Sequence, residues 1–332
     1  MKNRTIIFEK RPVGKPTAEC FRFTENEVPQ PGEGEVLLKT LFISVDPYLR
    51  GRMNEAKSYT AGFNLGDPMK SGVVAEVVDS KNNAFKTGDF VAARLNWSEY
   101  QTSTGEGLTK VDAEAAPLSA YQGLLGMPGL TAYLGLTEIG QPKKGETLVV
   151  SGAAGAVGNI VGQIGKILGC RVIGIAGSDE KTEMLKSEFG FDKVINYKTT
   201  PNMRKAISDA CPNGVDIYFD NVGGEISDGV IMNINKFARV IICGVISQYN
   251  ETRIPTGPRL QSIFLVNSAL MKGFIVSDFA TQFAEAIPQL TKWYRDGKLI
   301  NKETIVEGFE NIPEAFFGLF EGTNSGKMMV KI

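Results

Sequence analysis

The stretch VVSGAAGAVG, residues 149–158, decides how the chain folds. When the dinucleotide-binding pattern G-x-G-x-x-G is laid on it, the first glycine position falls on Ala153 and the other two on Gly155 and Gly158. The run ETLVVSG before the loop is typical of a strand, and AVGNIVGQIGKILG after it of a helix with one apolar side. A loop in this context holds a pyrophosphate on the N–H groups of the helix. The stretch therefore predicts a dinucleotide site, and an ordinary glycine turn is the alternative.

The rest of the sequence divides into two kinds of pattern. Residues 126–302 alternate between strand-like and helix-like segments, such as RVIGIAG and DEKTEMLKSEFG, which predicts a doubly wound parallel α/β sheet. Residues 1–125 contain short β-rich runs between turns such as PGEGE and KTGD, which indicates a partly open β-barrel. The tail, residues 303–332, returns to a strand–helix–strand pattern, and we expect it to rejoin the first domain.

The end of the second strand, after RVIGIA, indicates which dinucleotide binds. NAD enzymes usually carry an acidic residue there for the ribose 2′-hydroxyl, but this chain has Ala176, Gly177 and Ser178. The acids that follow, residues 179 and 180, fit the first turn of a helix, where the dipole favours negative charge. Ser178 either caps this helix or meets a phosphate, and Lys181 faces the same point one turn on. The pattern favours NADP(H), although Lys181 is also explained as a solvated helix residue.

Composition excludes several other classes of protein. The 332-residue chain has no histidine, which removes serine–histidine hydrolysis, the usual histidine zinc sites and histidine as a general base. Its 36 basic and 37 acidic side chains nearly cancel, so nucleic acid is a poor candidate partner. No apolar run reaches the length of a membrane span, and residues 6–8 are too short for a signal peptide, so we expect no membrane association and a cytoplasmic protein.

The cysteines do not form a metal-binding pattern. Cys20, Cys170, Cys211 and Cys243 are scattered without a short-spaced pair, whereas a structural zinc site needs clustered ligands. We expect them to be small buried side chains and predict no metal. Trp97, Tyr100 and Met127 are likewise interpreted mainly as packing residues.

Seven segments carry a family resemblance. They are VDPYLRGRM (45–53), AAGAVG (153–158), GSDEK (177–181), INYK (195–198), FDNVGG (219–224), CGVISQYN (243–250) and NSGK (324–327). Together they resemble the zinc-independent branch of the medium-chain dehydrogenase/reductases. Within it they are most similar to the prostaglandin reductase/leukotriene hydroxydehydrogenase, plant alkenal reductase and bacterial curcumin reductase group. The resemblance covers nearly the whole chain.

The resemblance implies an architecture and a site. Residues 1–125 and 303–332 would form a GroES-like catalytic domain, residues 126–302 a Rossmann NADP-binding domain, and the active site would lie between them. The implied cofactor contacts are the pyrophosphate for Gly155, Ala156, Val157 and Gly158, and the 2′-phosphate for Lys181, next to the cofactor-binding candidate Ser178. Tyr197 would lie near the adenosine phosphate, Asn221 would contact the cofactor, and Cys243, Gly244, Ser247 and Tyr249 would line the nicotinamide side. Phe274, Ile275, Val276 and Asn324 would close the pocket, and Tyr48 would lie in the substrate pocket.

The resemblance also implies a reaction and a partner. The expected activity is NADPH-dependent reduction of the C=C bond of an enal or enone, a small-molecule substrate, by a homodimer. Hydride addition to the β-carbon leaves an enolate, which needs hydrogen-bond donors as an oxyanion does. We expect the Tyr249 hydroxyl and the ribose of the cofactor to supply them, while water protonates the α-carbon. A zinc-independent quinone reductase and a non-catalytic NADPH-binding protein are the alternatives, and a structural role is the alternative for Tyr48, Tyr249, Asn221 and Asn324.

Overall fold

A computed structural model describes residues 2–55 and 58–332 of the chain. The chain divides into two compact units. Unit 1 consists of residues 1–122, 303–324 and 328–332, and unit 2 of residues 123–302 and 325–327. The C-terminal segment thus returns to the N-terminal unit, and each unit has its own sheet and core.

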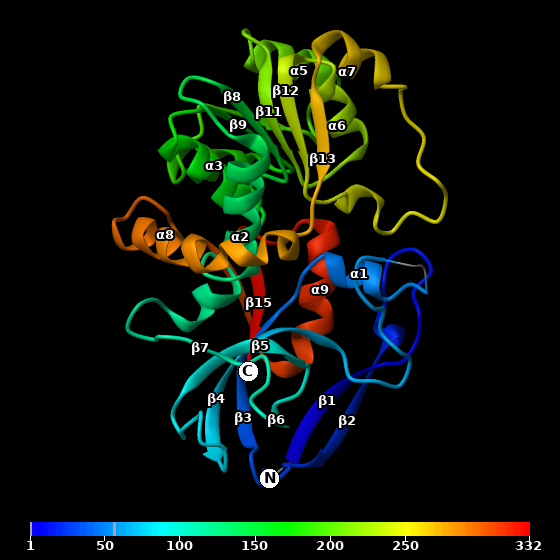
Figure 1. Cartoon of the computed structure of the whole chain (residues 1–332). Helices are drawn as coiled ribbons and strands as arrows, with labels where there is room; N and C mark the ends of the chain where they lie inside the picture. Colours follow the sequence, from blue (N-terminus) through cyan, green and yellow to red (C-terminus); the bar gives the residue numbers. More distant parts are fainter. Residues whose placement is uncertain (1, 56–57) are drawn as a thin grey trace. The chain divides into compact units, whose positions relative to one another are not determined.

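Unit 2 is built on a six-stranded parallel sheet in the order β10-β9-β8-β11-β12-β13 (Figure 1). The strands are β8 (Thr147–Ser151), β9 (Arg171–Ala176), β10 (Lys193–Asn196), β11 (Val215–Asp220), β12 (Ile234–Ile242) and β13 (Leu270–Gly273). The first strand in the sequence lies in the middle, and the chain then builds outward on both sides. This 3-2-1-4-5-6 order is that of the Rossmann fold, with a topological switch point between β8 and β11.

Helices cover both faces of this sheet. The helices of unit 2 are α2 (Met127–Leu134), α3 (Gly158–Ile167), α4 (Asp179–Ser187), α5 (Met203–Ala210), α6 (Gly224–Ile231), α7 (Gln261–Asn267) and α8 (Phe283–Arg295). Ile207 of α5 and Val230 of α6 pack with Val149 of β8 in one cluster. On the other side, α3 lies so close to the sheet that a Cβ on its Gly165 would be 2.5 Å from the Leu148 side chain. Alternate residues of β8 thus serve two cores, which explains why its three central residues, Leu148, Val149 and Val150, are all apolar.

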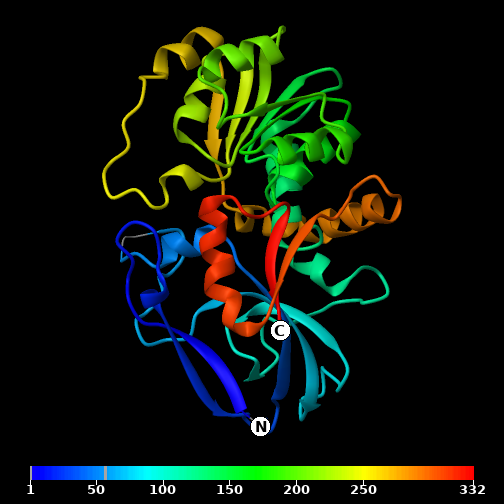
Figure 2. The ribbon, with the colours of Figure 1, turned by 180° about the vertical axis from the view of Figure 1, so that it is seen from behind.

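Unit 1 contains a two-stranded and a seven-stranded sheet, the latter in the order β14-β15-β3-β4-β5-β7, with β6 also paired to β3. The strands are β1 (Lys2–Phe8), β2 (Phe21–Glu27), β3 (Val36–Ser44), β4 (Lys70–Ser80), β5 (Phe90–Asn96), β6 (Tyr100–Ser103), β7 (Thr109–Lys110), β14 (Glu303–Glu307) and β15 (Lys327–Lys331). The C-terminal strand β15 runs antiparallel to β3, with Met329 opposite Ser44. Figure 2 shows this red C-terminal strand beside the blue β3.

An aromatic core holds unit 1 together. Its helices are α1 (Tyr48–Arg52) and α9 (Ile312–Glu321). Trp97 is fully buried between Phe21 and Phe316 of α9, and its indole N–H donates to the Ser71 hydroxyl at 2.7 Å. The packing role predicted for Trp97 is confirmed, whereas Met127 is wrong as a packing residue because 42% of it is exposed. Tyr100 is half-buried in β6.

The predicted fold class, a β-rich unit and a doubly wound parallel sheet, is confirmed. The structure adds strand β13 and helix α8, for which we made no prediction; all four residues of β13 are exposed, so it lacks the apolar run of a buried strand. Among the described residues 2–55 and 58–332, no helix combines the length and the apolar character needed to span a membrane.

Candidate functional site

The glycine loop lies where β8 ends, at the switch point of the parallel sheet. Its turn is made by Gly152, which has a positive φ of 57°, and not at Ala153, where we placed the first glycine of the pattern. Ala153 is fully buried, and its N–H donates to the Ile175 carbonyl at 3.0 Å. The loop therefore keeps a glycine for its tight turn, one residue earlier than the pattern requires.

Gly158 is fixed by close packing at the start of α3. A Cβ at this position would lie 2.3 Å from the Gly152 carbonyl oxygen, so no larger residue fits without movement of the backbone. The N-cap residue is Val157, whose side chain cannot accept a hydrogen bond. Gly155, Ala156 and Val157 are partly exposed before the helix. The loop thus presents main-chain N–H groups and the positive end of a helix dipole, as a phosphate site requires.

The ends of β9 and β10 bring three predicted residues together. Ser178 is the N-cap of α4, and its hydroxyl accepts the Lys181 N–H at 3.2 Å. The Tyr197 ring lies against Gly177, where a Cβ would be 2.9 Å from it. The pKa of Lys181 is lowered, first by burial and then by the positive charge of Lys198, and Glu180 opposes this shift. The ammonium groups of Lys181 and Lys198 are therefore close enough to repel each other, and Lys198 is a residue to which we had assigned no role.

Asn221 directly follows β11 and is held by the end of β8. Its backbone N–H donates to the Ser151 hydroxyl at 2.9 Å, and its side-chain amide donates to the Ser151 carbonyl at 2.8 Å. A Cβ on Gly152 would be 3.3 Å from that of Asn221, so the glycine turn and Asn221 are neighbours. Sequence reasoning missed Ser151 because nothing but its place before the loop distinguishes it.

The segment after β12 forms the third part of this edge. The 3-10 helix η4 (Ile246–Gln248) follows Cys243 and Gly244, and Ser247 donates to the Val222 carbonyl at 2.6 Å. The Tyr249 hydroxyl accepts the Val245 N–H at 3.5 Å and is 3.3 Å from where a Cβ of Gly244 would lie. Burial, and then the charge of Asp220, raises the pKa of the Cys243 thiol to about 12, so this thiol stays protonated at neutral pH.

Phe274 and Val276 serve the core of unit 2. The Phe274 ring is nearly buried, with its centroid 6.4 Å from that of Phe219, so any contact with a ligand would use its main chain. Val276 packs against Leu130 and Leu134 in a second cluster, and Ile275 lies between them, with its N–H donating to the Asp278 carboxylate at 3.0 Å.

Asn324 is the last residue of the 303–324 segment of unit 1, and the next three residues, 325–327, belong to unit 2. The Gly326 N–H donates to the Ala154 carbonyl at 2.7 Å, and Gly326 forms a bridge with Gly155. The chain that follows Asn324 thus reaches the glycine loop itself.

Tyr48 begins α1 in unit 1 and packs partly against its core. Burial, and then the negative charge of Asp46, raises the pKa of the Tyr48 phenol. The hydroxyl therefore stays protonated at neutral pH and can act as a donor, but not as a base.

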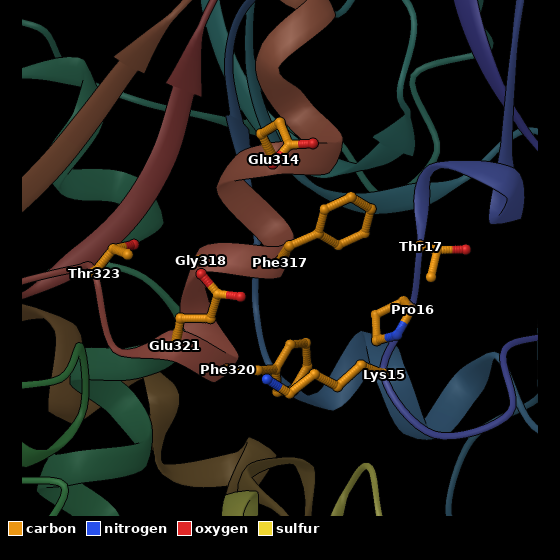
Figure 3. Close-up of a pocket in the computed structure, with 9 residues that line it drawn as sticks. All are labelled: Lys15, Pro16, Thr17, Glu314, Phe317, Gly318, Phe320, Glu321 and Thr323. Atoms are coloured by element: carbon orange, nitrogen blue, oxygen red, sulfur yellow. The ribbon is translucent and has the colours of Figure 1, made fainter.

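Unit 1 also has a cavity of about 390 Å³ along α9. Figure 3 shows its lining, which contains none of the predicted site residues: Lys15, Pro16, Thr17, Glu314, Phe317, Gly318, Phe320, Glu321 and Thr323. Glu314 and Glu321 contribute two carboxylates to this lining and Lys15 one ammonium group, and this balance disfavours an anionic ligand such as a dinucleotide. In the described part of the chain, no three His, Cys, Asp or Glu residues form a group that could hold a metal ion.

Together, a glycine loop before a helix, a cationic strand end and a polar switch point define a dinucleotide-binding oxidoreductase fold. Two family models match the chain: an N-terminal domain of oxidoreductase over residues 4–111 and a zinc-binding dehydrogenase over residues 156–292. The description of the second family model mentions zinc, but this chain has no histidine and therefore cannot form a histidine-ligated zinc site.

Similar proteins are known over the full length of the chain. An NADP-dependent oxidoreductase of Bacillus subtilis is 55% identical, with 98% of this chain and 97% of the relative covered. NADPH-dependent curcumin reductase of Escherichia coli is 41% identical (100% and 97% covered), and prostaglandin reductase 1 of Rattus norvegicus 46% (99% and 98%). The solved structure of CurA from Vibrio vulnificus with NADPH has a TM-score of 0.94 at 45% identity, covering 99% and 98%. The chain belongs to the medium-chain dehydrogenase/reductase family, in its zinc-independent branch.

Proposed function

We propose that this protein is an NADPH-dependent reductase of the C=C bond of α,β-unsaturated ketones and aldehydes. The observation that carries the proposal is the end of β9, where Ser178 and the partly buried Lys181 stand in place of an acid. A cationic strand end favours the 2′-phosphate of NADPH over the 2′-hydroxyl of NADH. Relatives named for curcumin, prostaglandin and 2-alkenal reduction support the substrate class.

The residues of unit 2 fit such a cofactor. Gly155, Ala156, Val157 and Gly158 offer main-chain donors for the pyrophosphate, and Tyr197 flanks the adenosine phosphate. Asn221, Cys243, Gly244 and Ser247 follow the next two strands, where ligands of parallel sheets bind. In this proposal Phe274, Ile275 and Val276 of unit 2 close the site, and Asn324, which belongs to unit 1, is a further closing residue.

NADPH supplies the hydride, and the protein supplies orientation and electrostatic stabilisation. Hydride addition to the β-carbon would move negative charge onto the substrate oxygen, and the Tyr249 hydroxyl would donate a hydrogen bond to that oxygen. Tyr48, held in its protonated form by burial, is a second donor for the substrate. The chain has no histidine to deliver a proton to the α-carbon, and in this proposal water delivers it.

We assign the catalytic domain to residues 1–125 and 303–332 and the NADP-binding domain to residues 126–302. The balanced charge gives no support for nucleic acid as a partner. The cytoplasmic location stays a prediction, which fractionation of cells that produce the tagged protein would test.

We further propose a homodimer that forms through the outer side of β13. This strand is at the edge of the six-stranded sheet, with Leu270 48% and Met271 44% exposed. On the adjoining α7, Leu265 is 79% and Val266 74% exposed. An apolar edge strand is normally covered, because its unpaired main-chain groups invite another strand.

One experiment tests the function directly. The purified protein is mixed with NADPH or NADH and a panel of enals, enones and quinones, and the loss of nicotinamide absorbance is followed. We expect turnover of enals and enones with NADPH, a saturated product by mass spectrometry, and much weaker activity with NADH. Turnover of quinones alone would favour a quinone reductase, and binding of NADPH without any turnover would contradict an enzyme.

A further inference from the structure

Asp220, the last residue of β11, is a buried carboxylate at the switch point. Its side chain is 1% exposed. One carboxylate oxygen, Oδ1, accepts four hydrogen bonds: from the hydroxyls of Ser151 and Tyr218, both at 2.8 Å, and from the N–H groups of Val222 and Gly223, both at 2.9 Å. A buried charge is tolerated only when donors replace water in this way, so all four donors are held in fixed directions.

The main chain of Asp220 joins a third strand to the same point. Its carbonyl oxygen accepts the N–H groups of Cys243 at 2.8 Å and Gly244 at 3.1 Å, just after β12. The residue thereby connects the carboxyl ends of β8, β11 and β12. These ends carry the glycine loop, Asn221 and the η4 segment respectively.

The orientation of Asn221 depends on this carboxylate through Ser151. The Ser151 hydroxyl donates to Asp220 and accepts the Asn221 N–H, so the carboxylate fixes the direction in which the hydroxyl lone pairs point. The Asn221 amide donates to the Ser151 carbonyl, which fixes the side chain as well. The Gly223–Gly224 turn that follows has positive φ values of 73° and 60° and is tied to Asp220 by the Gly223 N–H.

We propose that Asp220 is a positioning residue for the NADPH site, which orients Asn221 and the turn of residues 222–224 without contacting the cofactor. The inference rests on the proposed function, because the site that Asp220 shapes is the proposed cofactor site. Its role is electrostatic as well as steric: four donors converge on one carboxylate oxygen, and an amide oxygen of the same shape holds them more weakly.

Asp220→Asn tests this role. Hydrogen bonds to a charged group are stronger than neutral ones, so we expect the Kd and KM for NADPH to rise about tenfold or more. The kcat at saturating NADPH should change by less than about threefold, since the donors to the substrate remain. A fall in kcat with an unchanged KM for NADPH would overturn the proposal.

Asp216→Asn is the matched control. Asp216 is on the same strand near its opposite end, where its carboxylate accepts the Thr147 N–H at 2.8 Å and the Asn235 amide at 2.7 Å. The two variants have the same substitution in the same strand, but Asp216 is not at the carboxyl end of β11, where the proposed cofactor site lies. We expect a lower melting temperature and an unchanged Kd for NADPH; an equal rise in Kd in both variants would mean that Asp220 acts only through general stability.

A double variant separates action through Asn221 from other effects. If Asp220 works by orienting Asn221, the effect of Asp220→Asn on the Kd for NADPH depends on the presence of Asn221. We therefore expect Asp220→Asn to raise this Kd much less in the Asn221→Ala background than in the wild-type background. Full additivity of the two changes would contradict the proposed route.

Tyr218→Phe is the alternative variant if Asp220→Asn fails to fold. It removes one neutral donor from the same carboxylate oxygen, and we expect a roughly threefold rise in the Kd for NADPH. An unchanged Kd in Tyr218→Phe would then overturn the proposal.

The wild-type titration distinguishes this inference from the proposed function. Absence of NADPH binding by the wild-type protein would remove the proposed function itself. Tight binding by the wild type together with equally tight binding by Asp220→Asn would leave the function in place and refute the positioning role.

Discussion

Single side chains in this protein acquire their chemistry from burial. The Tyr48 phenol and the Cys243 thiol have raised pKa values because a charged form would be poorly solvated, and each is close to a carboxylate. Lys181 has a lowered pKa for the same reason, with Lys198 adding to it. The proposed site thus combines neutral donors with a cation that is incompletely solvated, which suits it to bind an anion.

At this scale, Tyr249→Phe should lower turnover and leave cofactor affinity intact. Loss of one donor to a developing oxyanion reduces kcat by about 100-fold, while the ring keeps its packing. Steady-state enone reduction and NADPH titration by fluorescence measure the two effects. Tyr133→Phe is the control, since Tyr133 is a tyrosine of the same unit whose ring packs on Trp293 and which has no role in the proposed reaction. Unchanged kcat in Tyr249→Phe would refute its catalytic role.

Lys181→Ala should separate the two cofactors. Removal of a charged partner of the 2′-phosphate should raise the KM for NADPH by about tenfold or more and change that for NADH little. The exposed Lys205, which pairs with Asp209 in the same unit, is the control as Lys205→Ala. Equal changes with both cofactors would count against the phosphate contact.

The lowered pKa of Lys181 gives this contact a pH dependence. The folded-state pKa lies below the ordinary value of 10.5, so the ammonium group is lost earlier than in a solvated lysine as pH rises. We expect the KM for NADPH to rise on the alkaline side before pH 10.5, and the KM for NADH to stay flat. For the protein without cofactor the sign is opposite: charging this group costs folding free energy, so stability increases as pH rises through the same window. An identical KM profile in Lys181→Ala would exclude Lys181 as the source.

At the scale of elements, the glycine loop and α3 depend on the absence of side chains. Gly152 supplies the left-handed turn, and Gly158 lets the helix start against the turn's own carbonyl. These two constraints place the N-terminus of α3 at the switch point, so the position of the proposed phosphate site follows from local packing.

Gly158→Ala should therefore reduce both stability and NADPH binding. The added Cβ would meet backbone 2.3 Å away, and such overpacking costs about 1–3 kcal/mol. Thermal unfolding and NADPH titration measure the outcome. The control is Gly51→Ala in α1, where a Cβ would have no neighbour within 4 Å and alanine favours the helix. Equal melting temperatures for the two variants would show that the loop adapts to the extra methyl group.

At the scale of the whole molecule, the exposed edge of unit 2 suggests assembly. The side of β13 away from β12, and Leu265 and Val266 of α7, are not covered by other described parts of the chain. A second copy with the same edge would pair with it and extend the sheet, as a closed two-fold interface allows.

Leu265→Glu combined with Val266→Glu should convert the proposed dimer into a monomer. The two introduced carboxylates would lose their hydrating water in an apolar interface, and this desolvation cost disfavours association. Sedimentation equilibrium should give twice the chain mass for the wild type and a single chain mass for the double variant. The control, Ile254→Glu, changes a residue that is 92% exposed on a loop and should leave the dimer intact. A monomeric wild type would refute the assembly.

Local sequence patterns alone determined the class of fold and the place of the glycine loop. Alternating strands and helices, a β-rich first part and a glycine-rich stretch after ETLVVSG predicted both sheets, because each signal depends on residues that are neighbours in the chain. The tertiary structure decided what arises between distant segments. The four donors around Asp220 come from two strands and a turn, and the turn glycine proved to be Gly152. The charge of Lys198, which follows β10, acts on Lys181 in α4. No local period encodes these contacts, since the sheet brings strand ends together only after the chain has folded.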